Sequence, residues 1–305
     1  MKKNNPIVDV RNMSVRFGDF YAVRDIYFSV FRGEIFGFLG ANGAGKTTTI
    51  RVLCGLLPAS LGTVIIDGAK FIPGREDVIK QKVGYMSQRF TLYDGLSVAE
   101  NFDFAAALRG LDTATYIKQR TKLLDFIGFD RTLSVVVKNL PGGIKQEIAL
   151  CVALLHNPAI IFLDEPTAGV APVARQRFWK IIRDLAAQGK TIFVTTHYMD
   201  EAENCHRIAL MRAGEIIATG SPAELKQRTF GANLYKLTPR HNNVRSVDMD
   251  VFDMFEPYGA HYHVRFRDGV NVARQIKKLS RDFVVVQIPP SLEDVFIRLV
   301  EGQNR

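Results

Sequence analysis

Short apolar runs, each followed by glycine or polar residues, recur along the first two thirds of the chain. The clearest are residues 35–39, 160–163 and 191–195, each long enough for one strand. Strands that are apolar at nearly every position are typical of parallel sheets covered on both faces. Ligands of such sheets bind at the carboxyl ends of the strands. The pattern therefore predicts a buried parallel sheet with a site among the polar residues that follow these runs.

Apolar residues at helical spacing predict the elements that cover this sheet. Between the last two runs they recur at i, i+3, i+4 and i+7, at Phe178, Ile181, Ile182 and Leu185. This spacing predicts an amphipathic helix packed on the sheet. Residues 98–127 also have a mostly helical pattern, with a break at Gly110. Upstream of the first run, residues 8–15 and 25–31 are expected to form strands.

The pattern changes near residue 229. Short strands are predicted at residues 234–237, 261–266 and 283–288, and a helix at residues 270–279. Ser291 and Asp294 have the spacing of a capping box, which predicts that a terminal helix begins there. We therefore divide the chain into a large domain, residues 1–228, and a small α+β appendage, residues 229–305.

Composition narrows the class of protein. The 305 residues are 47% hydrophobic and 23% charged, as in globular domains. No apolar stretch approaches the roughly 20 residues of a bilayer crossing, and the basic N-terminus lacks the apolar segment of a signal peptide. Cys54, Cys151 and Cys205 are far apart, which suits a reducing compartment. The net charge of +9 includes basic clusters at residues 226–228 and 274–281. We interpret these clusters as solvated faces, and attraction to an anionic membrane or to RNA as the weaker alternative.

A glycine-rich loop follows the first apolar run and has the form G-x-x-x-x-G-K-[ST]. Glycines let the backbone wrap closely around phosphates, and backbone amides then point at the phosphate oxygens. Lys46 is expected to reach the β- and γ-phosphates, and the Thr47 hydroxyl to bind Mg²⁺. Residues 48–54 predict a helix whose N-terminus faces the anion. The nucleotide contacts predicted here are Gly40, Asn42, Gly43, Ala44, Gly45, Lys46, Thr47 and Thr48.

Polar side chains at the ends of the other runs complete a candidate site. Asp164 is expected to hold Mg²⁺, directly or through water, and Glu165 to polarise the attacking water. His197 follows the next strand, and its ring could hydrogen-bond a γ-phosphate. Gln88 follows another short apolar stretch, where its amide could contact Mg²⁺ or the attacking water. A structural role is the alternative for His197 and Gln88 when each is considered alone.

Together these motifs resemble the ATP-binding subunits of ABC transporters. The resemblance covers roughly residues 7–225 and also includes Leu140-Pro141-Gly142-Gly143-Ile144-Lys145-Gln146. Residues 85–101 and 290–296 are similar to the ABC-2-type exporter branch, which includes drug and multidrug exporters. The resemblance implies an α/β fold: a P-loop ABC ATPase cassette with a mixed sheet, helices on both faces and a helical subdomain at about residues 90–155.

The resemblance also implies how the cassette works. ATP and Mg²⁺ bind in a head-to-tail homodimer or heterodimer, in which Gly142 and Gly143 of one subunit close the phosphate loop of the other. Free amides and a helix N-terminus give these glycines a physical basis for binding the γ-phosphate. Phe17 is expected to stack on adenine, with Tyr21 as the alternative. Separate ABC-2-type transmembrane subunits are the implied partners, at the cytoplasmic face of the inner membrane, and no nucleic acid is expected.

Three positions depart from the family pattern. Pro141 stands where the closing segment usually has a serine, which removes a hydroxyl donor to the γ-phosphate. Glu147 stands where the family has an arginine, which reverses a charge near the dimer interface. Ala171 stands where an aspartate usually couples the two subunits. We expect no inactivation from Pro141, and the effect of Ala171 on communication across the dimer stays open.

Two other functions compete with an exporter ATPase. The first is a soluble ABC-type ATPase acting on ribosomes or DNA, but such proteins usually carry two cassettes or a long coiled coil, and this chain has one cassette and no heptad tract. The second is another P-loop enzyme, such as a GTPase or small-molecule kinase. The segment at residues 140–146 and the Asp164-Glu165 pair argue against it. The transported molecule is not encoded in this chain, because the cargo path would lie in the membrane subunit.

Overall fold

The chain forms two compact units, Met1–Thr219 and Gly220–Arg305. The computed structural model describes residues 5–88, 92–241 and 247–301. The division falls earlier than the boundary we predicted after residue 228. The difference arises at helix α8 (Pro222–Phe230), which packs against helix α10 (Leu292–Glu301) and so belongs to the second unit.

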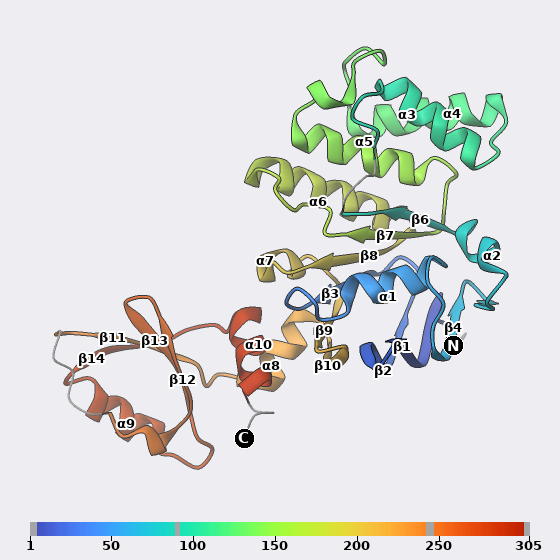
Figure 1. The fold of residues 1–305 in the computed structure, drawn as a ribbon. Helices are drawn as coiled ribbons and strands as arrows, with labels where there is room; N and C mark the ends of the chain where they lie inside the picture. The colour runs from blue at the N-terminus through green and yellow to red at the C-terminus, as the bar shows by residue number, and fades with distance from the viewer. Residues whose placement is uncertain (1–4, 89–91, 242–246, 302–305) are drawn as a thin grey trace. The chain divides into compact units, whose positions relative to one another are not determined.

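The first unit contains two sheets of different kinds (Figure 1). An antiparallel sheet has the order β2-β1-β4-β5, formed by Val8–Phe17 (β1), Phe20–Val30 (β2), Leu61–Ile66 (β4) and Ala69–Lys70 (β5). A second sheet has the order β10-β9-β3-β8-β7-β6, formed by Ile35–Leu39 (β3), Val83–Met86 (β6), Ile160–Asp164 (β7), Thr191–Thr196 (β8), Arg207–Arg212 (β9) and Glu215–Gly220 (β10). Within it, β9, β3, β8, β7 and β6 run parallel.

The central strands of the parallel sheet are buried at every position. This holds for β3, β7 and β8, the three apolar runs that predicted the sheet. Such complete burial requires that both faces of the sheet are covered, which is why these runs show no polar alternation. On one face the buried core also includes residues of β1, β2 and β4. The carboxyl ends of all three strands lie at one edge, since the strands are parallel and in register. The loops that follow them therefore meet there.

Helices cover this sheet and form a helical region beside it. The helices are Lys46–Leu53 (α1), Glu76–Lys80 (α2), Val98–Leu108 (α3), Thr113–Ile127 (α4), Gly142–Leu154 (α5), Pro172–Ala187 (α6) and Met199–Ala202 (α7), with a 3-10 turn at Val137–Asn139. Helices α3, α4 and α5 gather next to α6 (Figure 1). As predicted, α6 buries Phe178, Ile181, Ile182 and Leu185. The expected break near Gly110 separates α3 from α4.

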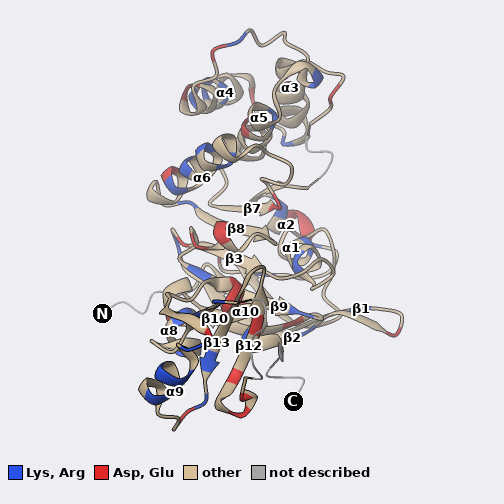
Figure 2. Cartoon of the chain, turned by 90° about the vertical axis from the view of Figure 1, so that its left-hand side faces the viewer, with Lys and Arg blue, Asp and Glu red and all other residues tan. Residues whose placement is uncertain are grey.

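The second unit is a four-stranded antiparallel sheet with helices. Its order is β12-β13-β11-β14, formed by Tyr235–Pro239 (β11), Phe252–Tyr258 (β12), His261–Phe266 (β13) and Phe283–Gln287 (β14), with a 3-10 turn at Met249–Val251. Helix α9 (Val272–Leu279) packs Val272, Ile276 and Leu279 into the core. Its Lys and Arg residues are exposed (Figure 2), as expected for a solvated face. The Ser291–Asp294 capping bonds are present at the start of α10.

No helix among the described residues combines the length and the apolar character needed to cross a bilayer.

Candidate functional site

The phosphate-binding loop lies between β3 and α1, and its glycines are required by close packing. A Cβ atom on Gly40 would come within 2.3 Å of the Met211 carbonyl oxygen. Gly45 has a φ of 104°, and a Cβ there would lie 2.7 Å from the Ala22 carbonyl oxygen. Side chains larger than glycine are therefore excluded at both positions by the neighbouring backbone. The loop consequently leads directly into the N-terminus of α1, where free amides favour an anion.

Lys46 is the cation of this loop and is almost completely buried. Its Nζ atom donates to the carbonyl oxygens of Gly40 at 2.8 Å and Ala41 at 3.0 Å. It also lies 3.8 Å from Glu165 Oε1. Burial lowers the pKa of Lys46, and the nearby carboxylates Glu165 and Asp164 oppose this effect. An incoming phosphate would supply further compensating negative charge at the ammonium group.

Asp164 and Thr47 form an oxygen-rich pair behind the loop. The Thr47 hydroxyl donates to Asp164 Oδ1 at 3.1 Å, although the two residues are far apart in sequence. Asp164 ends β7 and is buried. Hydroxyl and carboxylate oxygens are the hard donors that Mg²⁺ prefers, and Mg²⁺ usually uses few protein ligands beside substrate phosphates. The donor set here therefore fits the magnesium ion of a nucleotide complex.

Glu165 stands at the centre of the remaining polar contacts. The amide nitrogen of Gln88 donates to Glu165 Oε2 at 2.8 Å. His197 Nδ1 lies 3.5 Å from the same oxygen, too far for a good hydrogen bond. The His197 ring packs against Tyr198 with 4.1 Å between ring centroids. The structure thus brings Gln88 and His197 to Glu165, as their positions at strand ends suggested.

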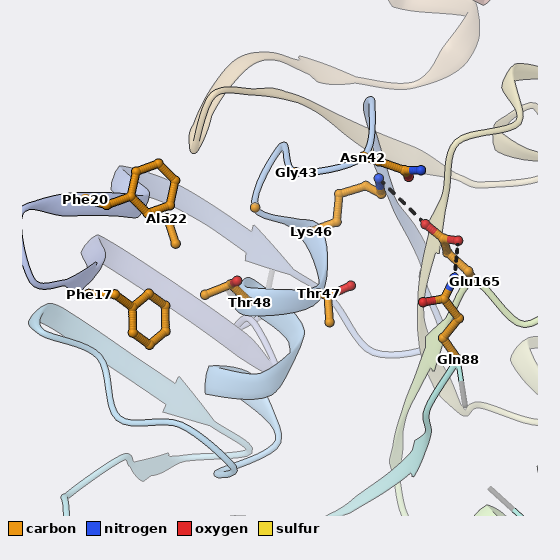
Figure 3. A pocket seen from close by; sticks show the side chains of 11 residues that line it. Phe17, Phe20, Ala22, Asn42, Gly43, Lys46, Thr47, Thr48, Gln88 and Glu165 are labelled. Atoms are coloured by element: carbon orange, nitrogen blue, oxygen red, sulfur yellow. Dashed lines mark hydrogen bonds and ion pairs between the residues drawn. The ribbon is translucent and has the colours of Figure 1, made fainter. Parts of the chain in front are cut away.

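A cavity of about 480 Å³ opens over these groups (Figure 3). Lys46, Thr47, Gln88 and Glu165 lie at one end of it, and aromatic side chains at the other. The lining residues are Phe17, Phe20, Ala22, Asn42, Gly43, Gly45, Lys46, Thr47, Thr48, Gln88 and Glu165. The cavity therefore offers an apolar, aromatic end and an ionic end, as a nucleotide requires.

The aromatic end consists of two rings, one of which the sequence did not indicate. Phe17 and Phe20 face each other across the turn between β1 and β2. Both are largely exposed, at 52% and 66%. Tyr21 is not among the described residues that line the cavity, and its ring lies against the guanidinium groups of Arg16 and Arg24. Phe20 could have been found from the tight hairpin, since pairing across it brings Phe20 opposite Phe17.

Some predicted site residues do not line the cavity: Gly40, Ala44, Asp164 and His197 lie in the loop or next to lining residues, and Gly142 and Gly143 lie on another element. These last two glycines begin α5, directly after Pro141 at its N-cap. A Cβ on Gly143 would come 2.6 Å from the Ala174 Cβ, so this glycine also has a packing role within its own subunit. Their proposed contact with the nucleotide of a second subunit stays a prediction.

Two of the positions that depart from the family pattern have structural roles within this chain: Glu147 forms an ion pair, and Ala171 stands at the N-cap of a helix. Glu147 is buried on α5, and its Oε1 pairs with Arg177 Nε on α6 at 2.7 Å. Burial raises the pKa of Glu147, and Arg177 opposes the rise. Glu147 is therefore an internal link between two helices within this chain. Ala171 is the N-cap residue of α6, and Pro172 is the first residue of that helix.

Known sequences that are similar to this chain are described as ABC transporter or export ATP-binding proteins. Residues 23–168 match the family described as ABC transporter. A probable multidrug ABC transporter ATP-binding protein, YbhF of Escherichia coli (strain K12), is 40% identical over 73% of this chain, and the match covers 38% of that protein. The matched part of the chain thus spans well under half of that relative's length. The Nod factor export ATP-binding protein I of Bradyrhizobium diazoefficiens is 34% identical over 98% of both chains.

Solved structures agree with these sequence matches. An ATP-binding subunit of an ABC transporter superposes with a TM-score of 0.65 at 27% identity, over 73% of this chain and 92% of the other. A dimeric ATP-binding cassette in a post-hydrolysis state with ADP and Pi has a TM-score of 0.63 at 25% identity, over 70% of this chain and 98% of the other. The predicted fold class is thereby confirmed, and the chain belongs to the family of ABC transporter ATP-binding proteins.

Proposed function

We propose that this chain binds and hydrolyses ATP to power an ABC-2-type membrane exporter. The observation that carries the proposal is the meeting of Lys46, Thr47 and Glu165 at one cavity that also has an aromatic end, with Asp164 bonded to Thr47 behind it. A loop that only bound phosphate would need no pair of adjacent carboxylates beside it. A hydrolase needs one acid for the metal and one for water, and the order Asp164-Glu165 supplies both.

Each group has a separate task in this proposal. Backbone amides of the loop and Lys46 bind the phosphates, and Phe17 and Phe20 enclose the base. Thr47 and Asp164 hold Mg²⁺, with Gln88 as a further candidate ligand. When bound, this ion neutralises charge on the phosphate oxygens. Glu165 accepts a proton from the attacking water, for which its carboxylate stands next to Lys46 and Gln88. His197 contacts the γ-phosphate beside it.

Dimer closure is the proposed source of mechanical work. In it, Gly142 and Gly143 at the N-terminus of α5 complete the phosphate site of the opposite subunit. The similarity to a dimeric cassette bound to ADP and Pi supports this arrangement. The partner ATPase is either an identical or a related chain.

The proposed cargo and location follow from the relatives. Because the similar proteins are described as multidrug and Nod factor export proteins, we propose that the cargo is a drug or another hydrophobic compound. The chain then acts at the cytoplasmic face of the inner membrane, bound to separate transmembrane subunits and without nucleic acid.

Purification of the tagged full chain from detergent-solubilised native membranes tests this proposal. We expect a multi-spanning membrane protein in fixed ratio to the chain, and we expect the chain to leave the membrane fraction when that protein is deleted. Recovery with ribosomes or nucleic acid, without a membrane protein, would instead identify a soluble ATPase. Equal membrane binding with and without the partner would show that the basic clusters act as anchors.

A further inference from the structure

We propose that Thr195 is a positioning residue that fixes both catalytic carboxylates at once; this inference rests on the proposed ATPase function. Thr195 lies in β8, on the strand beside β7, and its register partner is Asp164. The side chain is fully buried. A buried hydroxyl needs hydrogen-bond partners, and those of Thr195 are the two acids' own atoms.

The hydroxyl of Thr195 can donate one hydrogen bond, and it donates this bond to Asp164. Thr195 Oγ1 donates to Asp164 Oδ1 at 2.6 Å. The same Asp164 oxygen accepts from the Thr47 hydroxyl at 3.1 Å. Two hydroxyls on different elements thus hold one carboxylate oxygen from two sides. This fixes the rotation of the Asp164 side chain, and with it the direction of the oxygen that would hold Mg²⁺.

The oxygen of the same hydroxyl accepts a hydrogen bond from Glu165. The Glu165 backbone N–H donates to Thr195 Oγ1 at 2.9 Å and also to the Thr195 carbonyl oxygen at 3.2 Å. Glu165 has a φ of 47°, in the left-handed region that residues with a Cβ rarely adopt. Such a conformation persists only where the surroundings hold it. Thr195 provides two of the contacts that hold it here.

These two contacts link the metal site to the general base. Because one hydroxyl touches both residues, a movement of Asp164 and a movement of the Glu165 backbone are coupled through it. The next residue, Thr196, has a different task, since its hydroxyl donates to Glu201 Oε2 at 2.8 Å. The neighbouring hydroxyl therefore does not substitute for Thr195.

The test compares Thr195→Val with Thr195→Ser in the full chain. Valine has a similar shape and lacks the hydroxyl, whereas serine keeps the hydroxyl and lacks the methyl group. Thr191→Val is a matched control, because Thr191 lies in the same strand, is fully buried, and its hydroxyl accepts from the Gly33 amide at 3.1 Å. Melting temperatures identify any variant that fails to fold. The Glu165 amide keeps the Thr195 carbonyl in every variant, so we expect all three to fold.

Two readouts distinguish positioning from general packing. The first is Mn²⁺ affinity of the ATP-bound protein, measured by electron paramagnetic resonance, which does not depend on turnover. The second is kcat against KM for ATP. For Thr195→Val we expect both Mn²⁺ affinity and kcat to fall roughly 10- to 100-fold, the usual effect of losing a partner that orients a metal ligand. ATP affinity without metal should stay unchanged, and by linkage the affinity for the metal–ATP complex should fall together with Mn²⁺ affinity, so KM rises where it reflects binding.

Three outcomes decide the question. Thr195→Ser and Thr191→Val should keep the wild-type Mn²⁺ affinity and kcat. A folded Thr195→Val protein with wild-type values, or a Thr195→Ser protein as impaired as Thr195→Val, would overturn the positioning role while the ATPase proposal stands. A wild-type chain that neither binds nor hydrolyses ATP would reject the proposed function itself, and this inference with it.

Discussion

At the scale of single residues, the aromatic end of the cavity rests on side chains that make little contact with the protein. Phe17 and Phe20 are more than half exposed, which is costly for large apolar rings unless a ligand covers them. Both belong to one hairpin and line the same cavity as Lys46. We therefore interpret them as a pair that encloses adenine.

Alanine substitution at either ring should weaken ATP binding. Stacking between a base and an aromatic ring contributes about 1–3 kcal/mol, so Phe17→Ala or Phe20→Ala should lower affinity roughly 5- to 150-fold. Tyr21→Ala is the matched control, because Tyr21 directly follows Phe20 in the same hairpin and packs on arginines. Fluorescence titration with a nucleotide analogue measures all three. A loss in Tyr21→Ala alone would mean that the adenine lies on the other side of the hairpin.

At the scale of elements, His156 connects the end of α5 to the parallel sheet. Its Nε2 atom lies 3.0 Å from the Val83 carbonyl oxygen in β6. Burial, with help from the charges of Arg109 and Lys190, lowers the pKa of His156 from 6.5 to about 4, and the bond to Val83 opposes this shift. The folded protein therefore holds a neutral ring at pH values where the unfolded chain binds a proton.

The sign of the resulting pH dependence follows from proton binding. Between about pH 6.5 and pH 4 the unfolded state binds more protons at this site, so the free energy of unfolding falls as the pH falls. Carboxylates can add to the acid sensitivity of the wild type. Comparing the wild type with His156→Gln isolates the contribution of the histidine. Between about pH 6.5 and pH 4, the free energy of unfolding should fall less in the variant than in the wild type. Urea unfolding followed by the fluorescence of Trp179, the single tryptophan, measures the first unit. Parallel curves for the two proteins would contradict the assignment.

Local patterns predicted most elements, and the failures have physical reasons. Strands β3, β7 and β8 were predicted because complete burial makes them apolar at every position. Strand β12 was missed because it contains Pro257, which the ladder tolerates since β12 is an edge strand. The ionic part of the site was predicted because its motifs are local in sequence. Phe20 and Thr195 were missed because their contacts arise from pairing between strands.

At the scale of the whole molecule, the residues of the second unit that the structure describes include none that line the nucleotide cavity. Among its described residues, the sheet has a hydrophobic core of its own, and α8 packs against α10 of the same unit. We therefore expect it to regulate or stabilise the assembly rather than to take part in hydrolysis. A truncation after Thr219 removes the whole second unit, whereas one near residue 229 would keep most of helix α8.

Two truncations should behave differently. A chain ending at Thr219 should fold and bind ATP as the full chain does. A chain ending at Phe230 keeps α8 without α10, which leaves Leu225 and Phe230 without the partner helix against which α8 packs, so it should aggregate. Calorimetric ATP titration at equal folded fraction, with light scattering for aggregation, measures both. A folded chain ending at Thr219 that fails to bind ATP would show that the second unit contributes to the site.

The central claim, that this cavity hydrolyses ATP with Glu165 as the base, is tested most directly by Glu165→Gln in the full chain with its membrane partner. We predict unchanged ATP affinity and turnover slowed by about 10²–10⁴-fold, the usual contribution of a positioned general base. Lys46→Ala is the companion variant, and it should lose affinity because it removes the charge that binds phosphate. A Glu165→Gln protein that hydrolyses ATP at the wild-type rate would contradict the account.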